Sequence, residues 1–220
     1  MNRTRIKICG LTREEDVRTV IEAGADALGF VFYPESPRFV TAEKAAVLTS
    51  AVPAFVSTVG LFVNASAGEI AETVRKVPLS LLQFHGDETP EACHEAAALA
   101  SLPFIRVFRV KPDTRSDDLI QYEQIYRNAS PFFRGLLLDA WTEAYGGAGK
   151  VFNWSLVSKG IGPRVVLSGG LSAQNVAGAV SELRPFAVDV SSGVEAARGI
   201  KDAGKIHAFI NAVRKADETV

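Results

Sequence analysis

The 220-residue chain has little sulfur, with two cysteines, Cys9 and Cys93, and a single methionine. Two cysteines are too few for a disulfide framework, and their spacing does not match that of a metal site. The chain also has no excess of basic residues: it contains 24 Lys and Arg and 25 Asp and Glu, which gives a net charge of −1. Binding nucleic acid through its phosphates requires a basic surface, so that class of function is disfavoured.

Long apolar runs are missing as well. The N-terminal segment MNRTRIKICG contains no apolar run of signal-peptide length, and no stretch approaches the roughly 18 apolar residues of a membrane helix. We therefore expect a cytoplasmic protein with reduced thiols, no membrane partner and no nucleic-acid partner. Hydrophobic residues make up 47% of the chain and charged residues 22%, which is typical of a globular protein with a sizeable core.

Short apolar segments alternate with longer amphipathic ones along the whole chain. Their Ile, Val, Leu and Phe content predicts buried strands at Arg5–Cys9, Ala27–Val31, Ala54–Phe62, Ser80–Phe84, Pro103–Val107, Phe133–Leu138, Arg164–Leu167 and Phe186–Val190. Between them, helix starts are expected near Thr12, Ser66, Ser172 and Asp202. Eight successive βα units with no linker predict an α/β fold, a single-domain (β/α)8 TIM barrel over residues 1–220.

Polar residues and glycines gather after the carboxyl ends of the predicted strands, where barrels of this class carry their active sites. They are Cys9, Gly10, Ser36, Arg38, Gln83, His85, Asp139, Gly146 to Lys150, Ser168 to Gly170 and Asp189 to Gly193. The opposite strand ends offer mostly Pro, Ala and charged helix ends. This asymmetry predicts an enzyme.

The glycine loops after strands seven and eight predict a phosphate site. Converging backbone N–H groups bind phosphate, and a Cβ would hold that backbone away. The candidates are Gly169, Gly170, Ser191, Ser192 and Gly193, together with Gly147 and Gly149 of the sixth loop. Glycines that only make tight turns are the alternative. Two such loops on adjacent final strands favour phosphate, and a short helix beginning near Ser192 would point its positive end at the anion.

Two strand-end residues suit acid–base chemistry. Cys9 is either a small buried apolar residue or a proton acceptor, and Lys7, two residues earlier, would share its face and stabilise a thiolate. Asp139 ends an apolar strand, where a carboxylate is unusual without a partner. Asp189 is expected to pair with Lys7, because strands one and eight are neighbours in a closed barrel. Cys93, His94 and His207 are expected to lie on outer helices.

Motifs along the whole chain resemble those of phosphoribosylanthranilate isomerases. The resemblance rests on Lys7-Ile-Cys-Gly-Leu-Thr12, Gly24-Ala-Asp-Ala-Leu-Gly-Phe30, Ser36-Pro-Arg-Phe-Val40, Val59-Gly-Leu-Phe-Val-Asn64, Leu82-Gln-Phe-His-Gly-Asp-Glu88, Leu137-Leu-Asp139, Gly146-Gly-Ala-Gly149, Leu167-Ser-Gly-Gly-Leu171 and Asp189-Val-Ser-Ser-Gly-Val-Glu195. The first and last of these motifs are together highly specific, whereas the Gly-Gly motifs occur in many phosphate-binding barrels.

The resemblance implies an Amadori rearrangement of N-(5'-phosphoribosyl)anthranilate in tryptophan biosynthesis. It makes Cys9 the general base and Asp139 the general acid, and it places Arg38 on the anthranilate carboxylate. Lys7, Gln83, His85 and Asp189 are expected to line the substrate site. An iminium intermediate supplies the electron sink, so we expect no metal and no organic cofactor. Whether the chain is a monomer or a homodimer is left open.

Three other functions fit the sequence less well. The related aminoaldose isomerase of histidine biosynthesis has Asp where this chain has Cys9. A metabolite-binding subunit without activity would need no acid–base pair. Indole-glycerol-phosphate synthase would show a catalytic Lys pattern and an N-terminal extension. The sequence departs from the resembled family at Ala148, Asn153 and Ser168, so no substrate contact from a sixth-loop hydroxyl is expected.

Overall fold

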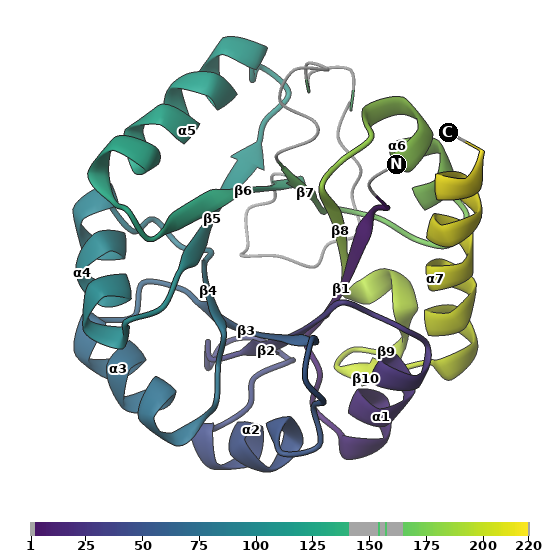
Figure 1. The fold of residues 1–220 in the computed structure, drawn as a ribbon, viewed down its shortest axis with the longest axis horizontal. Coiled ribbons are helices and arrows are strands. Elements are labelled where there is room, and N and C mark those ends of the chain that lie inside the picture. Colours follow the sequence, from purple (N-terminus) through teal and green to yellow (C-terminus); the bar gives the residue numbers. More distant parts are fainter. Residues whose placement is uncertain (1–2, 141–153, 155–156, 158–164, 220) are drawn as a thin grey trace.

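The computed structural model describes residues 3–140, 154, 157 and 165–219. Eight parallel strands close into a barrel in chain order, and helices surround it (Figure 1). The strands are β1 Arg5–Cys9, β2 Ala27–Val31, β3 Ser57–Phe62, β4 Leu81–Phe84, β5 Phe104–Val110, β6 Phe133–Ala140, β7 Val166–Leu167 and β8 Ala187–Val190. Pairing of β1 with β8, which sets Lys7 opposite Asp189, closes the ring. The (β/α)8 barrel expected from the sequence is confirmed.

The outer ring contains seven α-helices among the described residues. They are α1 Glu14–Glu22, α2 Ala42–Thr49, α3 Ala67–Lys76, α4 Pro90–Ala100, α5 Ser116–Ala129, α6 Val176–Leu183 and α7 Ala203–Glu218. Two expected helix starts are confirmed. Ser66 and Glu69 form a capping box at α3, and the Asp202 carboxylate accepts a hydrogen bond from the Lys205 N–H at α7.

Thr12 as a helix cap, Ser172 as a helix start and Ala54 as a strand start are wrong. Thr12 does not cap α1, because its hydroxyl donates to the Gly199 carbonyl at 2.6 Å. Ser172 does not begin α6, which starts at Val176. Strand β3 begins at Ser57 rather than Ala54, since Phe55 has a φ of 69° that an extended strand does not allow. Of the expected seventh strand, Arg164 lies outside the described residues.

Apolar residues pack in three clusters. The main core fills the layer between the strands and the helices and includes Phe30, Phe84, Phe104 and Phe209. A smaller cluster of Ile105, Val107 and Leu137 is separate from that core. A third group, on the neighbouring strands β1, β2 and β3, contains Cys9, Val31 and Leu61. The Cys9 thiol therefore lies in apolar surroundings.

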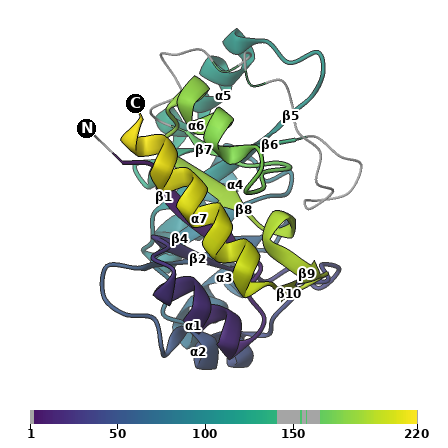
Figure 2. The ribbon, with the colours of Figure 1, turned by 90° about the vertical axis from the view of Figure 1, so that its right-hand side faces the viewer.

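After β8 the chain makes a small addition to the barrel. A 3-10 helix, η3 at Ser192–Val194, leads into an antiparallel pair, β9 Glu195–Ala197 and β10 Ile200–Lys201. Figure 2 shows this hairpin beside the end of α7 at which that helix begins. The hairpin lies against the loop that follows β2, because a Cβ at Gly199 would be 2.8 Å from the Pro37 carbonyl oxygen.

Candidate active site

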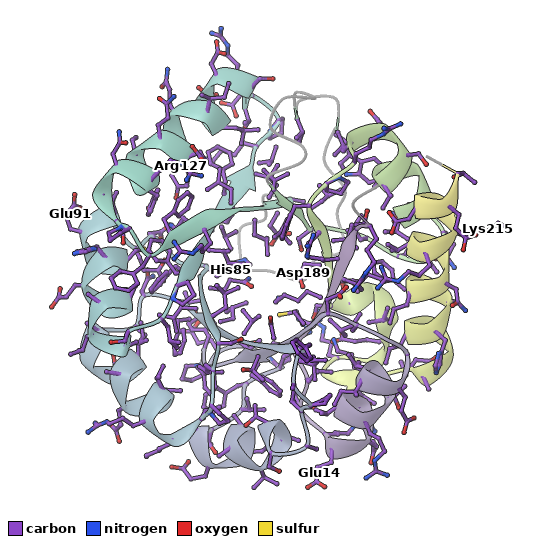
Figure 3. All side chains as sticks on the ribbon, viewed as in Figure 1. Glu14, His85, Glu91, Arg127, Asp189 and Lys215 are labelled. Carbon is purple, nitrogen blue, oxygen red and sulfur yellow. The ribbon has the colours of Figure 1, made fainter. Side chains whose placement is uncertain are left out.

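Cys9, Lys7 and Asp189 meet on one side of the barrel mouth. The Lys7 ammonium donates to Asp189 at 2.8 Å, and both side chains are almost completely buried. The Lys7 ammonium also lies close enough to the Cys9 thiol to act on it electrostatically. The expected pairing of Lys7 with Asp189 is confirmed. In Figure 3 Asp189 points toward the barrel centre, whereas Glu14 and Lys215 point outward.

The three groups set each other's protonation. Burial lowers the pKa of Lys7, but Asp189 and Cys9 outweigh it, so the pKa of Lys7 is raised and the ammonium stays charged. Burial raises the pKa of the Cys9 thiol, and the Lys7 charge offsets this only in part. The expectation that Lys7 favours a thiolate is right in direction. Before substrate binds, however, burial has the larger effect on the pKa, so the thiol keeps its proton.

Glycines make room for this arrangement. Gly29 on β2 is the register partner of Cys9. A Cβ there would lie 2.7 Å from the Cys9 sulfur and 3.1 Å from the Lys7 nitrogen, which is too close for either atom to stay in place. Gly10, with a φ of 77°, similarly leaves space for Arg38, whose Cδ would be 2.4 Å from a Cβ at that position.

Arg38 is part of a buried charge cluster. Its Nε and Nη2 donate to the two carboxylate oxygens of Glu195 at 2.7 and 2.8 Å. Lys201 donates to the same carboxylate at 3.0 Å and also to the carbonyl and hydroxyl oxygens of Ser191. Burial raises the pKa of Glu195, but the two cations outweigh it and the net shift is downward.

Gln83, His85 and Asp139 form a second group, on strands β4 and β6. The Gln83 side-chain amide lies 3.2 Å from Nδ1 of His85, and Nε2 of His85 lies 3.3 Å from an Asp139 oxygen. Figure 3 shows His85 directed toward the barrel centre. Gln83 Oε1 and His85 Nε2 are buried without a hydrogen-bond partner.

The expected phosphate loops after β7 and β8 are both held by side chains. The Asn175 amide donates to the Gly170 carbonyl at 2.9 Å and accepts from the Ser172 N–H at 2.8 Å. Gly169 and Gly170 both have positive φ, and a Cβ at Gly169 would be 3.0 Å from an Asp139 oxygen. The loop after β8 turns into η3 at Ser192, as expected, and a Cβ at Gly193 would collide with the Leu171 carbonyl.

Other expected positions fall elsewhere. Gly147 and Gly149 lie outside the described residues, as do Ala148 and Asn153. Cys93 and His94 lie on α4 and His207 on α7, in the outer ring as expected. Burial raises the pKa of the Cys93 thiol to about 12.

Within the described part of the chain, no three His, Cys, Asp or Glu side chains are grouped to hold a metal ion. No helix there has the length and apolar character to cross a membrane.

Four residues without an expected role are part of this site: Gly29, Asn175, Glu195 and Lys201. A glycine inside a strand was the available signal for Gly29, because it often marks close approach of another group. Glu195 ends the motif that begins at Asp189. Asn175 and Lys201 carried no such signal, since their partners become neighbours only in the folded barrel.

Comparison with known proteins agrees with this geometry. The family model described as N-(5'phosphoribosyl)anthranilate (PRA) isomerase matches residues 6–212. An N-(5'-phosphoribosyl)anthranilate isomerase of Herminiimonas arsenicoxydans is 59% identical, with 99% of this chain and 96% of the relative aligned. The Thermotoga maritima phosphoribosyl anthranilate isomerase has a TM-score of 0.84 at 41% identity, over 96% of this chain and 99% of that one.

A further solved structure of this type was crystallised with reduced 1-(o-carboxyphenylamino)-1-deoxyribulose 5-phosphate. It has a TM-score of 0.80 and 38% identity, over 96% of this chain and 99% of that one. These matches extend over nearly the whole chain, and they agree with the resemblance carried by the motifs. The chain therefore belongs to the N-(5'-phosphoribosyl)anthranilate isomerase family.

Proposed function

We propose that this chain converts N-(5'-phosphoribosyl)anthranilate to 1-(2-carboxyphenylamino)-1-deoxyribulose 5-phosphate in tryptophan biosynthesis, with Cys9 as general base and Asp139 as general acid. One observation carries the proposal: a thiol next to the Lys7 ammonium and a carboxyl group beside His85 stand at the ends of β1 and β6 in one barrel. Family membership supports it, and so does the relative crystallised with a reduced form of the product.

Asp139 begins the reaction in this proposal. Its protonated carboxyl group donates to the ring oxygen of the ribose, the bond from C1 to that oxygen breaks, and the nitrogen lone pair forms an iminium. His85 Nε2 lies 3.3 Å from an Asp139 oxygen, next to the carboxyl group. Gly169 keeps the next loop clear of the other oxygen. The step needs a positioned acid and no further electron sink.

Cys9 completes the reaction. Its thiolate removes the proton from C2, the C2–H electrons form the C1–C2 double bond, and the iminium electrons return to nitrogen. The resulting enolamine tautomerises to the ketone. Because burial raises the pKa of Cys9, the thiol must first lose its proton to solvent, and the adjacent Lys7 charge favours that loss. Asp189 keeps Lys7 in place for this role.

The two anionic ends of the substrate are assigned to different loops. Arg38 binds the ring carboxylate; its Nη1 remains available, since Glu195 uses Nε and Nη2. The loops at Gly169–Gly170 and Ser191–Gly193 bind the phosphate through backbone N–H groups. A side chain at Gly170, where φ is 63°, would strain the loop and fill this space. Gln83 and His85, each with an unpartnered buried atom, face the substrate between the two ends.

We further propose that the chain acts in the cytoplasm as a single domain, without metal or organic cofactor. The separation of β1 and β6 by two strands lets the acid and the base approach different parts of one substrate. The rival aminoaldose isomerization of histidine biosynthesis is disfavoured because Cys9 stands at the first strand end.

One assay tests the function. Freshly prepared N-(5'-phosphoribosyl)anthranilate is mixed with the protein, and the loss of anthranilate-type fluorescence is followed. We expect turnover that depends on protein concentration, while the aminoaldose phosphate of histidine biosynthesis is left unchanged. Turnover of only the second substrate, or of neither, contradicts the proposal.

The phosphate assignment has its own test. Gly170→Val is expected to raise KM severely, whereas Ser192→Ala is mild, because backbone donors survive removal of a hydroxyl. A complex with a product analogue is expected to show the phosphate between the loops after β7 and β8. Phosphate density at the loops after β2 or β4 contradicts this orientation and, with it, the roles of Cys9 and Asp139.

A further inference from the structure

Lys201 is a completely buried lysine that the proposed chemistry does not use. Its side chain has no exposed surface, and its ammonium donates to the Ser191 carbonyl, the Ser191 hydroxyl and Glu195, all at 3.0 to 3.3 Å. A buried lysine is costly unless every donor is satisfied, and three acceptors satisfy this one. Such a residue contributes its charge to the site, or it fixes the positions of its hydrogen-bond partners.

The backbone of Lys201 is fixed as firmly as its ammonium. Its N–H donates to an Asp16 oxygen at 3.3 Å, and its carbonyl accepts from Arg13 at 3.2 Å. Arg13 and Asp16 are themselves joined by an ion pair at the start of α1. Both the backbone and the ammonium group of Lys201 are therefore held in place, and the ammonium group has little freedom to leave Glu195.

Lys201 changes the net charge of the cluster. Arg38 and Glu195 alone form a neutral pair, which would attract a second carboxylate only weakly. With Lys201 on the same carboxylate, the three side chains carry one net positive charge inside the barrel mouth. The nearby Lys7–Asp189 pair adds no net charge. Burial lowers the pKa of Lys201 against the pull of Glu195, so an approaching anion stabilises its charged form.

We propose that Glu195 and Lys201 are positioning residues for Arg38, with Glu195 fixing the plane of its guanidinium and Lys201 restoring the positive charge that Glu195 removes. The cluster thereby presents a fixed, positively charged guanidinium, with Nη1 available, to the ring carboxylate of the substrate. This inference rests on the proposed function, because it takes Arg38 as the carboxylate contact. Neither Glu195 nor Lys201 needs to touch the substrate.

The physical gain is pre-organisation. A free arginine loses side-chain entropy when it binds a ligand, and a guanidinium already held through Nε and Nη2 loses less. A neutral pair would lose the Coulomb attraction that makes a partly desolvated carboxylate bind. Both effects act on the carboxylate end of the ligand. Selectivity for a carboxylated ring is therefore the property that the cluster controls.

The experiment compares two ligands on folded protein by calorimetry. One is reduced 1-(o-carboxyphenylamino)-1-deoxyribulose 5-phosphate, and the other is the same molecule without the ring carboxylate. Lys201→Met is expected to weaken the carboxylated ligand about 10- to 100-fold and the other ligand less than about threefold. Lys205→Met is the matched control, because the ammonium of this exposed lysine donates to the Glu195 backbone carbonyl and not to its carboxylate. It should change neither affinity.

A double-mutant cycle locates the effect. In an Arg38→Met background, Lys201→Met should no longer alter the preference for the carboxylated ligand. If Lys201→Met weakens both ligands equally in otherwise native protein, Lys201 is only structural and the inference is overturned. If native protein does not prefer the carboxylated ligand, the Arg38 assignment falls together with this inference. Full preference in native protein and in Lys201→Met overturns the inference alone. Should Lys201→Met not fold, Lys201→Gln removes the charge and keeps a donor to Ser191.

Discussion

The two sides of the barrel mouth differ in how completely their charged and polar groups are paired with one another. On the side of β8, β1 and β2, the charged groups Lys7, Asp189, Arg38, Glu195 and Lys201 are all paired with one another. On the side of β4 and β6, Gln83 Oε1 and His85 Nε2 are buried without a hydrogen-bond partner, and Asp139 lies 3.3 Å from His85. The first side is complete before a ligand arrives, whereas the second side lacks partners that a ligand can supply.

This difference fits the roles proposed for the two sides. A base that must lose a proton in apolar surroundings needs fixed charges close by, and the paired side provides them. Unpartnered buried polar atoms cost free energy until something binds them. The open side therefore gains more from substrate than the paired side does. Variants on each side should behave differently, and four experiments examine this.

Cys9→Ser on the paired side should have the largest effect. A hydroxyl holds its proton far more tightly than a thiol, so kcat should fall toward the upper end of about 10²–10⁴-fold. Steady-state kinetics at substrate saturation measure it. Cys93→Ala, which changes a thiol on the outer helix α4, is the control and should keep its kcat. Near-native kcat in Cys9→Ser would remove Cys9 from the chemistry.

Asp139→Asn on the open side should lower kcat by about 10²-fold or more. We expect a smaller loss than for Cys9→Ser, because His85 Nε2 remains near the ring oxygen and can supply part of the proton transfer. Asp87→Asn, an exposed carboxylate after β4, is the matched control. If kcat is unchanged while KM rises, Asp139 binds substrate and another group is the acid.

Gly29→Ala tests how tightly the paired side is built. The new Cβ would lie 2.7 Å from the Cys9 sulfur, so the thiol or the strand must shift. We expect kcat to fall by about 10- to 100-fold and the free energy of unfolding by about 1–3 kcal/mol. Gly68→Ala, where a Cβ meets nothing within 4 Å, should leave kcat unchanged. Equal kcat in both variants would mean that the sulfur position tolerates displacement.

Acid should weaken the paired side through Glu195, with the smallest effect of the four. The pKa of Glu195 lies below its ordinary 4.5, so its ionisation stabilises the fold above that pH and the contribution is lost as pH falls through the lowered pKa. The difference in unfolding free energy between native protein and Glu195→Gln should be constant from neutral pH down to about 5 and should then become smaller as the pH falls further.

Thermal or denaturant unfolding across this pH range measures that gap. Glu14→Gln, which alters an outward-pointing carboxylate on α1 (Figure 3), is the comparison variant. A gap that widens in acid would show that the Glu195 carboxylate is destabilised by its surroundings, in conflict with its two cationic partners.

Much of the barrel could be predicted from the sequence because its strands are short, apolar and regularly spaced. The bounds expected for β1 and β2 are those observed. Asp139 and Cys9 could be placed at strand ends by counting, and Lys7 with Asp189 by barrel closure. Local errors arose where a side chain found a distant partner, as when Thr12 bonded Gly199 instead of its own helix.

The charge cluster could not be predicted in the same way. Arg38 and Glu195 are 157 positions apart in the sequence, and Lys201 stands just before a helix start, where charged residues are ordinary. Only the folded hairpin brings Lys201 to Glu195. The direction of the Cys9 pKa shift was also out of reach, because it depends on how completely the folded barrel removes water from the thiol.

The hydrogen bond between Lys7 and Asp189 joins residues 182 positions apart, and this has a consequence for synthesis. Cys9 and Lys7 leave the ribosome among the first residues, while Asp189, Glu195 and Lys201 leave among the last. Until translation is nearly finished, the Cys9 thiol has neither its apolar enclosure nor a fixed ammonium beside it. A nascent or C-terminally truncated chain therefore carries an ordinary cysteine, and the surroundings on which its proposed role as base depends are complete only with the final βα unit.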